Sequence, residues 1–173
     1  MRAMQGTKKK GNLINGRDIA MQVAIFLFYV CAFSVILTSG LSADDMWKAF
    51  KSLLTAAKWH DIGRSHDGID RGHGKKSAEI FRSLGNKDSV AEFLMEYHCR
   101  SDKEAKTYLN THFAGEDKEL IWLDYQILKD ADALDRWRFG YGCQDFVDVK
   151  SLHLETSKEL MAVAAYFQNV DMG

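Results

Sequence analysis

Apolar residues recur every three or four positions along most of the 173-residue chain. This spacing is typical of helices that turn one face toward a core. Polar and glycine-containing stretches interrupt the pattern and mark where helices end. The pattern predicts helices over residues 17–38, 43–61, 74–84, 87–99, 101–112, 116–138 and 151–169. We therefore expect an all-α fold, a compact bundle of about six or seven helices.

Local signals support these boundaries and the domain organisation. Ser42 and Asp44 are suitable N-cap residues for the helix over 43–61, and Gly63 follows its end. Four glycines between residues 62 and 74 predict a loop. Residues 1–16 are polar, basic and contain glycine, so we expect a flexible segment there. Residues 17–173 should form a single domain, without repeats or linkers.

Residues 19–37 are apolar on every side. Such a run suits a central core helix, a membrane span of roughly 20 residues, or the apolar part of a signal peptide. The stretch 39–43 is a poor cleavage site, with leucine where a small residue is preferred. We favour the core helix and expect no insertion into a membrane.

Composition narrows the function classes. The net charge is −1 and the charged residues are interspersed, so no basic stripe indicates nucleic acid as a structural partner. The three cysteines are odd in number and lack the paired spacing of a metal site. They suit reduced thiols in a cytoplasmic protein.

The pair His60-Asp61 stands at the end of the helix over 43–61. At about 100° per residue, Asp61 falls within the apolar arc of that helix and His60 at its edge. A carboxylate turned toward a core is costly unless it is paired or binds a metal. Two adjacent ligand-type residues on a core face therefore indicate a divalent metal site.

Further ligand-type residues follow on other segments. His73 lies in the glycine-rich loop, and His98 flanks the apolar arc of its helix. On the helix over 116–138, Asp130 lies at the margin of the apolar face, whereas Asp132 points almost to the opposite side. We therefore expect Asp130 as a ligand, and Asp132 as a solvated residue or a partner of a ligand.

In this order the motifs resemble the HD-domain superfamily of metal-dependent phosphohydrolases. The resemblance covers residues 15–140 and is carried by AAKWHDIGR (56–64), DGID (67–70), HG (73–74), SA (77–78), EYH (96–98) and KDADALDR (129–136). In that superfamily an early histidine, the His-Asp pair and a late aspartate hold one metal. Histidines from between them help to hold a second metal.

The resemblance implies a cofactor of one or two divalent ions, drawn from Mn, Fe, Co, Ni, Zn and Mg. His60, Asp61 and Asp130 would hold the first ion, and Asp61, His73 and His98 the second. Such ions activate water for attack on a phosphoryl group. Asp61 would take part in catalysis, while Arg64 and Arg138 could neutralise the phosphate.

The early histidine of the superfamily has no counterpart here. Ile19 stands at the corresponding place, three residues before Gln22-Val23, and no histidine precedes His60. Asn15, Asp18 and His66 are candidate substitutes. Loss of this ligand would weaken one metal position or abolish catalysis.

Two functions therefore stay open. The first is a divalent-metal-dependent phosphohydrolase that acts on a phosphorylated small molecule or a nucleotide. The second is a catalytically silenced scaffold that serves as a ligand-binding or protein-interaction module. We favour the enzyme, because buried acids cost stability and a chain without catalysis has no physical need to keep them. A homo-oligomer is compatible with either function.

Overall fold

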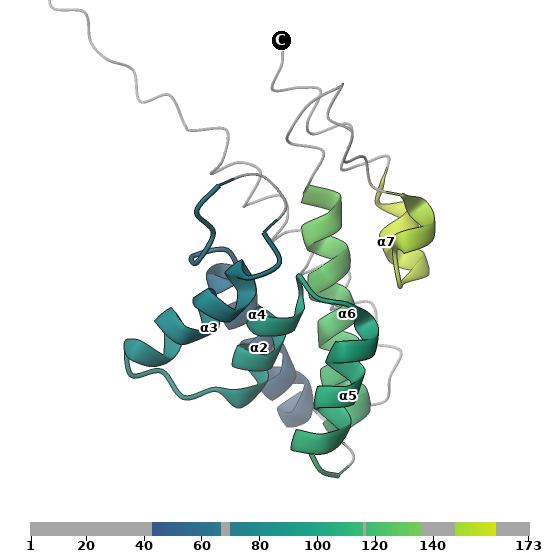
Figure 1. Ribbon diagram of the computed structural model, residues 1–173. Coiled ribbons are helices and arrows are strands. Elements are labelled where there is room, and N and C mark those ends of the chain that lie inside the picture. Colours follow the sequence, from purple (N-terminus) through teal and green to yellow (C-terminus); the bar gives the residue numbers. More distant parts are fainter. Residues whose placement is uncertain (1–42, 67–69, 116, 136–147, 162–173) are drawn as a thin grey trace, which may run out of the picture.

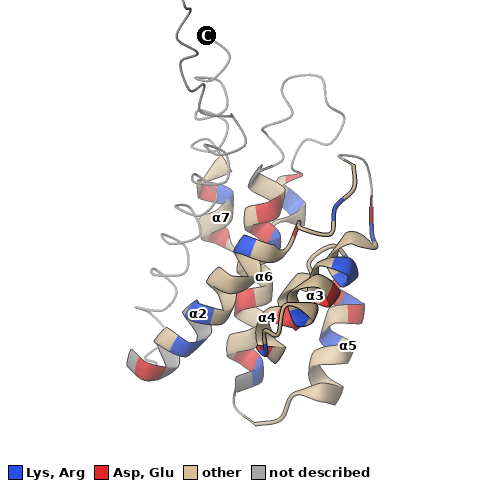
Figure 2. Cartoon of the chain, turned by 90° about the vertical axis from the view of Figure 1, so that its left-hand side faces the viewer, with Lys and Arg blue, Asp and Glu red and all other residues tan. Residues whose placement is uncertain are grey.

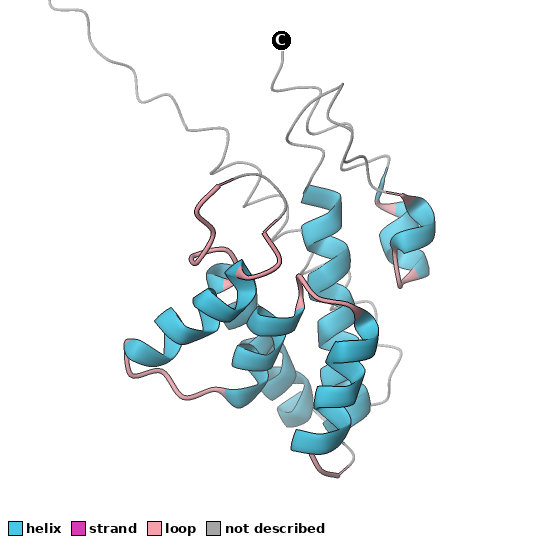
Figure 3. Cartoon of the chain, in the orientation of Figure 1, coloured by secondary structure: helices cyan, strands magenta, loops and turns pink. Residues whose placement is uncertain are grey.

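The computed structural model describes residues 43–66, 70–115, 117–135 and 148–161. Within these ranges every regular element is helical, as Figure 1 and Figure 3 show. The elements are α2 (Ala43–Trp59), α3 (His73–Ser83), α4 (Ser89–Tyr97), α5 (Asp102–His112), α6 (Asp117–Asp135), the 3₁₀ helix η2 (Val149–Ser151) and α7 (Glu155–Glu159). The all-α prediction is confirmed.

Short-range hydrogen bonds explain several helix boundaries. The Asp88 side chain caps α4 by accepting a hydrogen bond from the Ala91 amide, at 2.9 Å. At the start of α5, Ser101 and Glu104 form a reciprocal capping box. Gly85, with φ of +82°, follows the end of α3 in the left-handed region that glycine adopts without strain. These signals place the helices before any long-range packing is considered.

The core lies where α2, α4 and α6 meet. Helix α4 packs against α2, α3 and α6, and α6 packs in turn against α2 and α5 (Figure 1). Buried apolar side chains fill the centre, among them Leu53 and Ala56 of α2, Leu94 of α4 and Leu128 of α6. This packing brings the last turn of α2, the first turn of α3 and the last turn of α4 together.

Acidic and basic residues are intermixed along the described helices, as the colours in Figure 2 show. None of the described helices is both long and apolar enough to cross a bilayer. The run over 19–37, for which three interpretations were weighed, lies outside the described residues. The division into residues 1–16 and 17–173 stays a prediction.

The helix predicted over 151–169 differs from the structure. Residues 149–151 form a 3₁₀ turn, 152–154 are extended, and α7 begins only at Glu155. The extended stretch directs its backbone amides toward α6, where Asp130 accepts their hydrogen bonds. The helix predicted over 17–38 falls outside the described residues. The other helices match their predicted bounds within two residues wherever the structure describes both ends.

Candidate metal centre

The His-Asp pair lies in the turn that follows α2. The His60 amide donates to the Ala56 carbonyl at 2.8 Å, which extends the helical pattern by one residue. The Arg64 amide then donates to the Asp61 carbonyl at 3.0 Å and closes the turn. Both side chains are partly exposed, by 22% for His60 and 26% for Asp61. The pair therefore lies at the rim of the core and is open to a ligand.

Glycine allows the turn after α2 to lie directly against α3. A Cβ atom on Gly63 would stand 2.6 Å from the Ser77 amide nitrogen and 2.7 Å from the His73 carbonyl oxygen. The Gly63 amide instead donates to the Ser77 hydroxyl at 3.0 Å, and this hydroxyl donates to the His60 carbonyl. The contact holds the His-Asp pair beside the first residue of α3.

A second glycine brings α3 equally close to α4. A Cβ atom on Gly74 would lie 2.4 Å from the Met95 carbonyl oxygen and 2.9 Å from that of Glu96. As a result His73, at the start of α3, and His98, just after α4, face each other with ring centroids 4.7 Å apart. Both histidines are 2% exposed, so the pair is buried.

Asp61 directs its two oxygens to two different sets of atoms. His60 Nε2 lies 3.8 Å from Asp61 Oδ2 and 3.8 Å from Asp132 Oδ1 of α6. We call His60, Asp61 and Asp132 the His60 cradle. Asp61 Oδ1 lies 3.1 Å from His73 Nε2 and 4.0 Å from His98 Nε2. We call Asp61, His73 and His98 the His98 cradle.

Hydrogen bonds fix the tautomers of the two buried histidines. His98 Nδ1 lies 2.7 Å from the Met95 carbonyl oxygen, and His73 Nδ1 contacts the Asp70 carbonyl oxygen. A carbonyl only accepts, so both Nδ1 atoms carry hydrogen and both Nε2 atoms are directed into the centre. These Nε2 atoms are 2.8 Å apart. Two imidazole nitrogens at this distance, beside the Asp61 carboxylate, need a proton or a cation between them, and the donor set suits a divalent metal.

Electrostatics distinguishes His60 from His98. Burial lowers the pKa of His98 to about 4, helped by the neighbouring His60, so this ring is neutral at pH 7. Burial also acts against a charge on His60, but the hydrogen bond with Asp132 and the charge of Asp61 raise its pKa to about 8. Burial likewise opposes the charge of Asp61. Its hydrogen bond with His73 and the proximity of His60 outweigh burial and lower the pKa of Asp61 well below its usual range.

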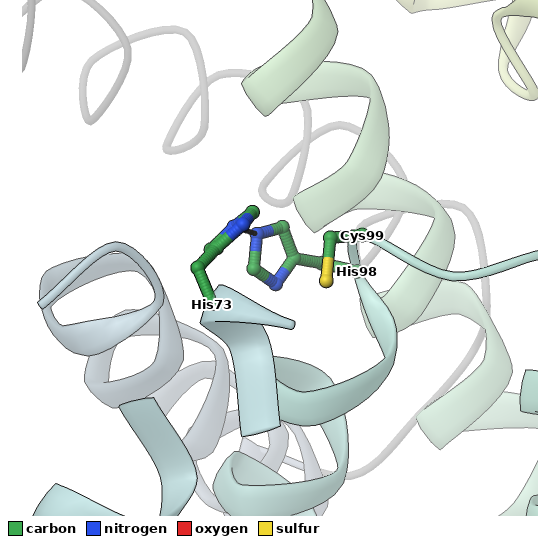
Figure 4. Close-up of side chains that lie close together, drawn as sticks. All are labelled: His73, His98 and Cys99. Atoms are coloured by element: carbon green, nitrogen blue, oxygen red, sulfur yellow. Dashed lines mark hydrogen bonds between the residues drawn. The ribbon is translucent and has the colours of Figure 1, made fainter. Parts of the chain in front are cut away.

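Cys99 lies beside the His98 cradle but is poorly suited to it. His73, His98 and Cys99 offer ligand atoms within 4.8 Å of one another. Figure 4 shows the two rings turning nitrogen atoms toward each other, with the Cys99 sulfur on the far side of the His98 ring. The thiol donates to the Arg71 carbonyl at 3.3 Å, and burial raises its pKa. A protonated thiol is a weak ligand, so Asp61 completes this set better than Cys99 does.

The placement of the two aspartates of α6 corrects the helical-face argument. Asp130, 2% exposed, accepts hydrogen bonds from the His153 and Leu154 amides at 2.9 Å and contacts His153 Nδ1 at 2.6 Å. His153 Nε2 lies 3.1 Å from Asp102 Oδ2. We call Asp102, Asp130 and His153 the His153 clasp. Asp132 faces His60, which agrees with the expectation of a partner of a ligand and not with that of a solvated residue.

The His153 clasp was not predicted from the sequence. His153 stands in a stretch that was predicted to be helical, and a lone histidine there carries no distinctive signal. Only its long-range contacts with α5 and α6 show what it does. The clasp surrounds the Asp130 carboxylate with hydrogen bonds from His153 and Leu154, and it is Asp132 of α6 that faces His60.

Arg64 is the cation that the structure places in the centre. Its Nε lies 3.1 Å from Asp61 Oδ1, and its Nη2 lies 3.3 Å from His73 Nε2. Arg138, the other arginine expected near a phosphate, lies outside the described residues, as do Ile19, Asn15 and Asp18. His66 is exposed.

Comparison with known families agrees with this geometry. The sequence model of the HD domain family matches residues 32–137, more than half of the chain. The chain is an all-α protein in which a His-Asp pair lies beside further histidines and an aspartate. It belongs to the HD domain family. The matched stretch begins after Ile19. Neither the curated proteins nor the solved structures gave a match.

Proposed function

We propose that the protein is a divalent-metal-dependent phosphohydrolase that acts on a phosphate ester or a nucleotide. The observation that carries the proposal is the division of the Asp61 carboxylate between two sets of donor atoms, the His60 cradle and the His98 cradle. Membership of the HD domain family supports the same reaction class. We expect the protein to work in the cytoplasm on a small phosphorylated molecule.

The residues of the His60 cradle fit a divalent metal. His60 Nδ1 donates to the Ala57 carbonyl at 2.8 Å, which turns Nε2 toward the two carboxylates. A metal bound there would polarise a phosphoryl oxygen and lower the pKa of a bound water. We propose His60, Asp61 and Asp132 as its ligands. Asp132 replaces Asp130 in this proposal because the His153 clasp occupies Asp130.

The chain contributes positive charge for a phosphate at the same place. Arg64 is bound to Asp61 on one side and has a fork of donors that suits phosphate oxygens. Its side chain is 20% exposed, so part of the guanidinium is accessible. We propose that Arg64 orients the phosphoryl group, while Asp61 holds the arginine in register with the metal ligands.

The test is an assay of phosphate esters and nucleotides with Mn, Co, Ni and Mg. Wild type is compared with Asp61→Ala and with Glu79→Ala, which removes an exposed acid of α3 outside the centre. We expect turnover in wild type and in Glu79→Ala. Asp61→Ala should lose more than the roughly 10- to 100-fold that changes around a ligand typically cause. Equal turnover in all three proteins would refute the proposal.

The same panel separates the enzyme from the silenced scaffold. Ile19→His restores the residue type that the family resemblance places near the start of the domain. Activity that appears only in this variant would identify a silenced centre. Turnover in wild type that is lost in Asp61→Ala would mean that catalysis does not need a histidine at position 19.

A further inference from the structure

We propose that the Arg64 guanidinium takes the place of a second cation at the His98 cradle, so that the centre binds one divalent metal and not two. The proposal rests on the metal dependence of the proposed function and specifies how many ions the centre accepts. It concerns a residue of this chain that directly contacts two of the three donor groups in question.

Arg64 uses the same atoms that a metal in the His98 cradle would need. Its Nε lies 3.1 Å from Asp61 Oδ1, which is also the oxygen that faces His73 Nε2 at 3.1 Å. Its Nη2 lies 3.3 Å from His73 Nε2. An imidazole nitrogen offers a single lone pair, so an arginine donor and a metal ion compete for His73 Nε2. At Asp61 Oδ1 the positively charged guanidinium occupies the side on which a metal in the His98 cradle would lie.

The charges of the centre favour a single added dication. The described donors of the two cradles include two carboxylates, Asp61 and Asp132. Arg64 retains its charge at every accessible pH and already neutralises Asp61 from the side of His73. A second dication would be repelled by this fixed positive charge.

The local fold holds Arg64 in this position. Arg64 follows Asp61 by three residues in a turn closed by the hydrogen bond from the Arg64 amide to the Asp61 carbonyl. Gly63 presses this turn against α3, as its close approach to the His73 carbonyl shows. The guanidinium therefore reaches the His98 cradle as part of the turn that also carries the His-Asp pair.

The experiment measures how many Mn²⁺ ions each protein binds. Full-length wild type, Arg64→Met, Arg64→Lys and Arg71→Met are dialysed against Mn²⁺, and bound metal is counted by elemental analysis. Electron paramagnetic resonance then distinguishes isolated Mn²⁺ from a coupled pair. Arg71 is an exposed arginine whose removal controls for the loss of one charge. Circular dichroism checks folding, and Arg64→Gln serves as a second variant if Arg64→Met does not fold.

We expect one Mn²⁺ in wild type, Arg71→Met and Arg64→Lys, and two in Arg64→Met or Arg64→Gln, with the signal of a coupled pair. Two ions in wild type, or equal numbers in wild type and the neutral variants, would overturn the proposal. Wild type tests the proposed function separately, since absence of bound Mn²⁺ there counts against metal dependence. The role of Arg64 is judged only by whether the neutral variants bind a second Mn²⁺ ion.

Discussion

Two histidine–aspartate clusters can be compared: the His153 clasp has one histidine and two aspartates, and the His98 cradle has two histidines and one aspartate. In the His153 clasp both ring nitrogens of His153 face carboxylate oxygens, and two backbone amides complete the shell of Asp130. In the His98 cradle the Nε2 atoms of two histidines face each other at 2.8 Å. The first cluster is complete as it stands, and the second depends on a proton or a cation beside its nitrogen atoms. Completeness of the hydrogen bonds, and not residue type, separates a structural cluster from a binding centre.

Among the predicted substitutions, Asp130→Ala should have the largest effect on stability, because it disrupts the His153 clasp. It removes a buried acceptor of several hydrogen bonds and leaves two amides of residues 153 and 154 without their partner. We expect a loss of about 3 kcal/mol in the free energy of unfolding, measured by urea denaturation. The variant should still bind metal at the His60 cradle at urea concentrations below the midpoint of its own unfolding.

Asp132→Ala is the matched change in the His60 cradle, which shares Asp61 with the His98 cradle. It should abolish binding of Mn²⁺ to the His60 cradle and alter the unfolding free energy by less than Asp130→Ala does. If the two substitutions exchanged these effects, the assignment of the two aspartates would have to be reversed.

Asp124, earlier on α6, adds a buried acid that belongs to neither cluster. Its Oδ2 has no hydrogen-bond partner among the described residues, and burial raises the pKa of Asp124 well above its usual value of 3.8. Below pH 3.8 both folded and unfolded chains are protonated. Above it, only the unfolded chain loses its proton at first, so wild-type stability falls as pH rises.

Asp124→Asn should therefore stabilise the protein by about 1 kcal/mol or more at pH 8, with a smaller gain at pH 4. Urea denaturation at both pH values provides the measurement. Glu119→Gln, which neutralises an exposed acid of the same helix, should show no such dependence. A gain that shrinks with rising pH would show that Asp124 is stabilised by a partner.

His153→Gln should have the smallest effect, and it should destabilise the protein where Asp124→Asn stabilises it. The hydrogen bond with Asp130 raises the pKa of His153, despite burial, and Asp102 adds to this. The stabilisation is then fully present below the unfolded pKa of about 6.5. It disappears as pH rises through the higher folded pKa.

Wild type should exceed His153→Gln in stability at pH 6 and approach it at pH 9. We expect a difference below about 1 kcal/mol, since Asp102 is half exposed and solvent screens the pair. A difference that grows toward pH 9 would mean that His153 acts in its neutral form.

The sequence was informative where one helix face determines burial. His60, Asp61 and His98 could be placed from the apolar arcs of their own helices, and the structure brings them together. His73 was expected in the loop but opens α3. The all-α fold followed from periodicity alone.

The helical face of α6 did not identify which aspartate lies beside His60, because the centre lies at the rim of the core. Asp132 faces His60 from a partly exposed side of α6. Asp130 lies at the margin of the apolar face of α6, where it contacts His153 and not the His-Asp pair. The position of a residue on a helical face indicates how deeply its side chain is buried, but not which other element packs against it. The competition between Arg64 and a cation also depends on distances that no spacing in the chain encodes.

The glycines at positions 63 and 74 have a consequence for finding other chains with this centre. Neither glycine contributes a ligand, yet a methyl group on Gly74 would collide with the carbonyl of Met95 and separate the helices that carry His73 and His98. A sequence search that requires only the histidines and aspartates would accept chains whose helices cannot come this close. Requiring glycine directly after the first histidine of α3 would select for the spacing itself, so a residue without a side chain is the more discriminating part of the signature.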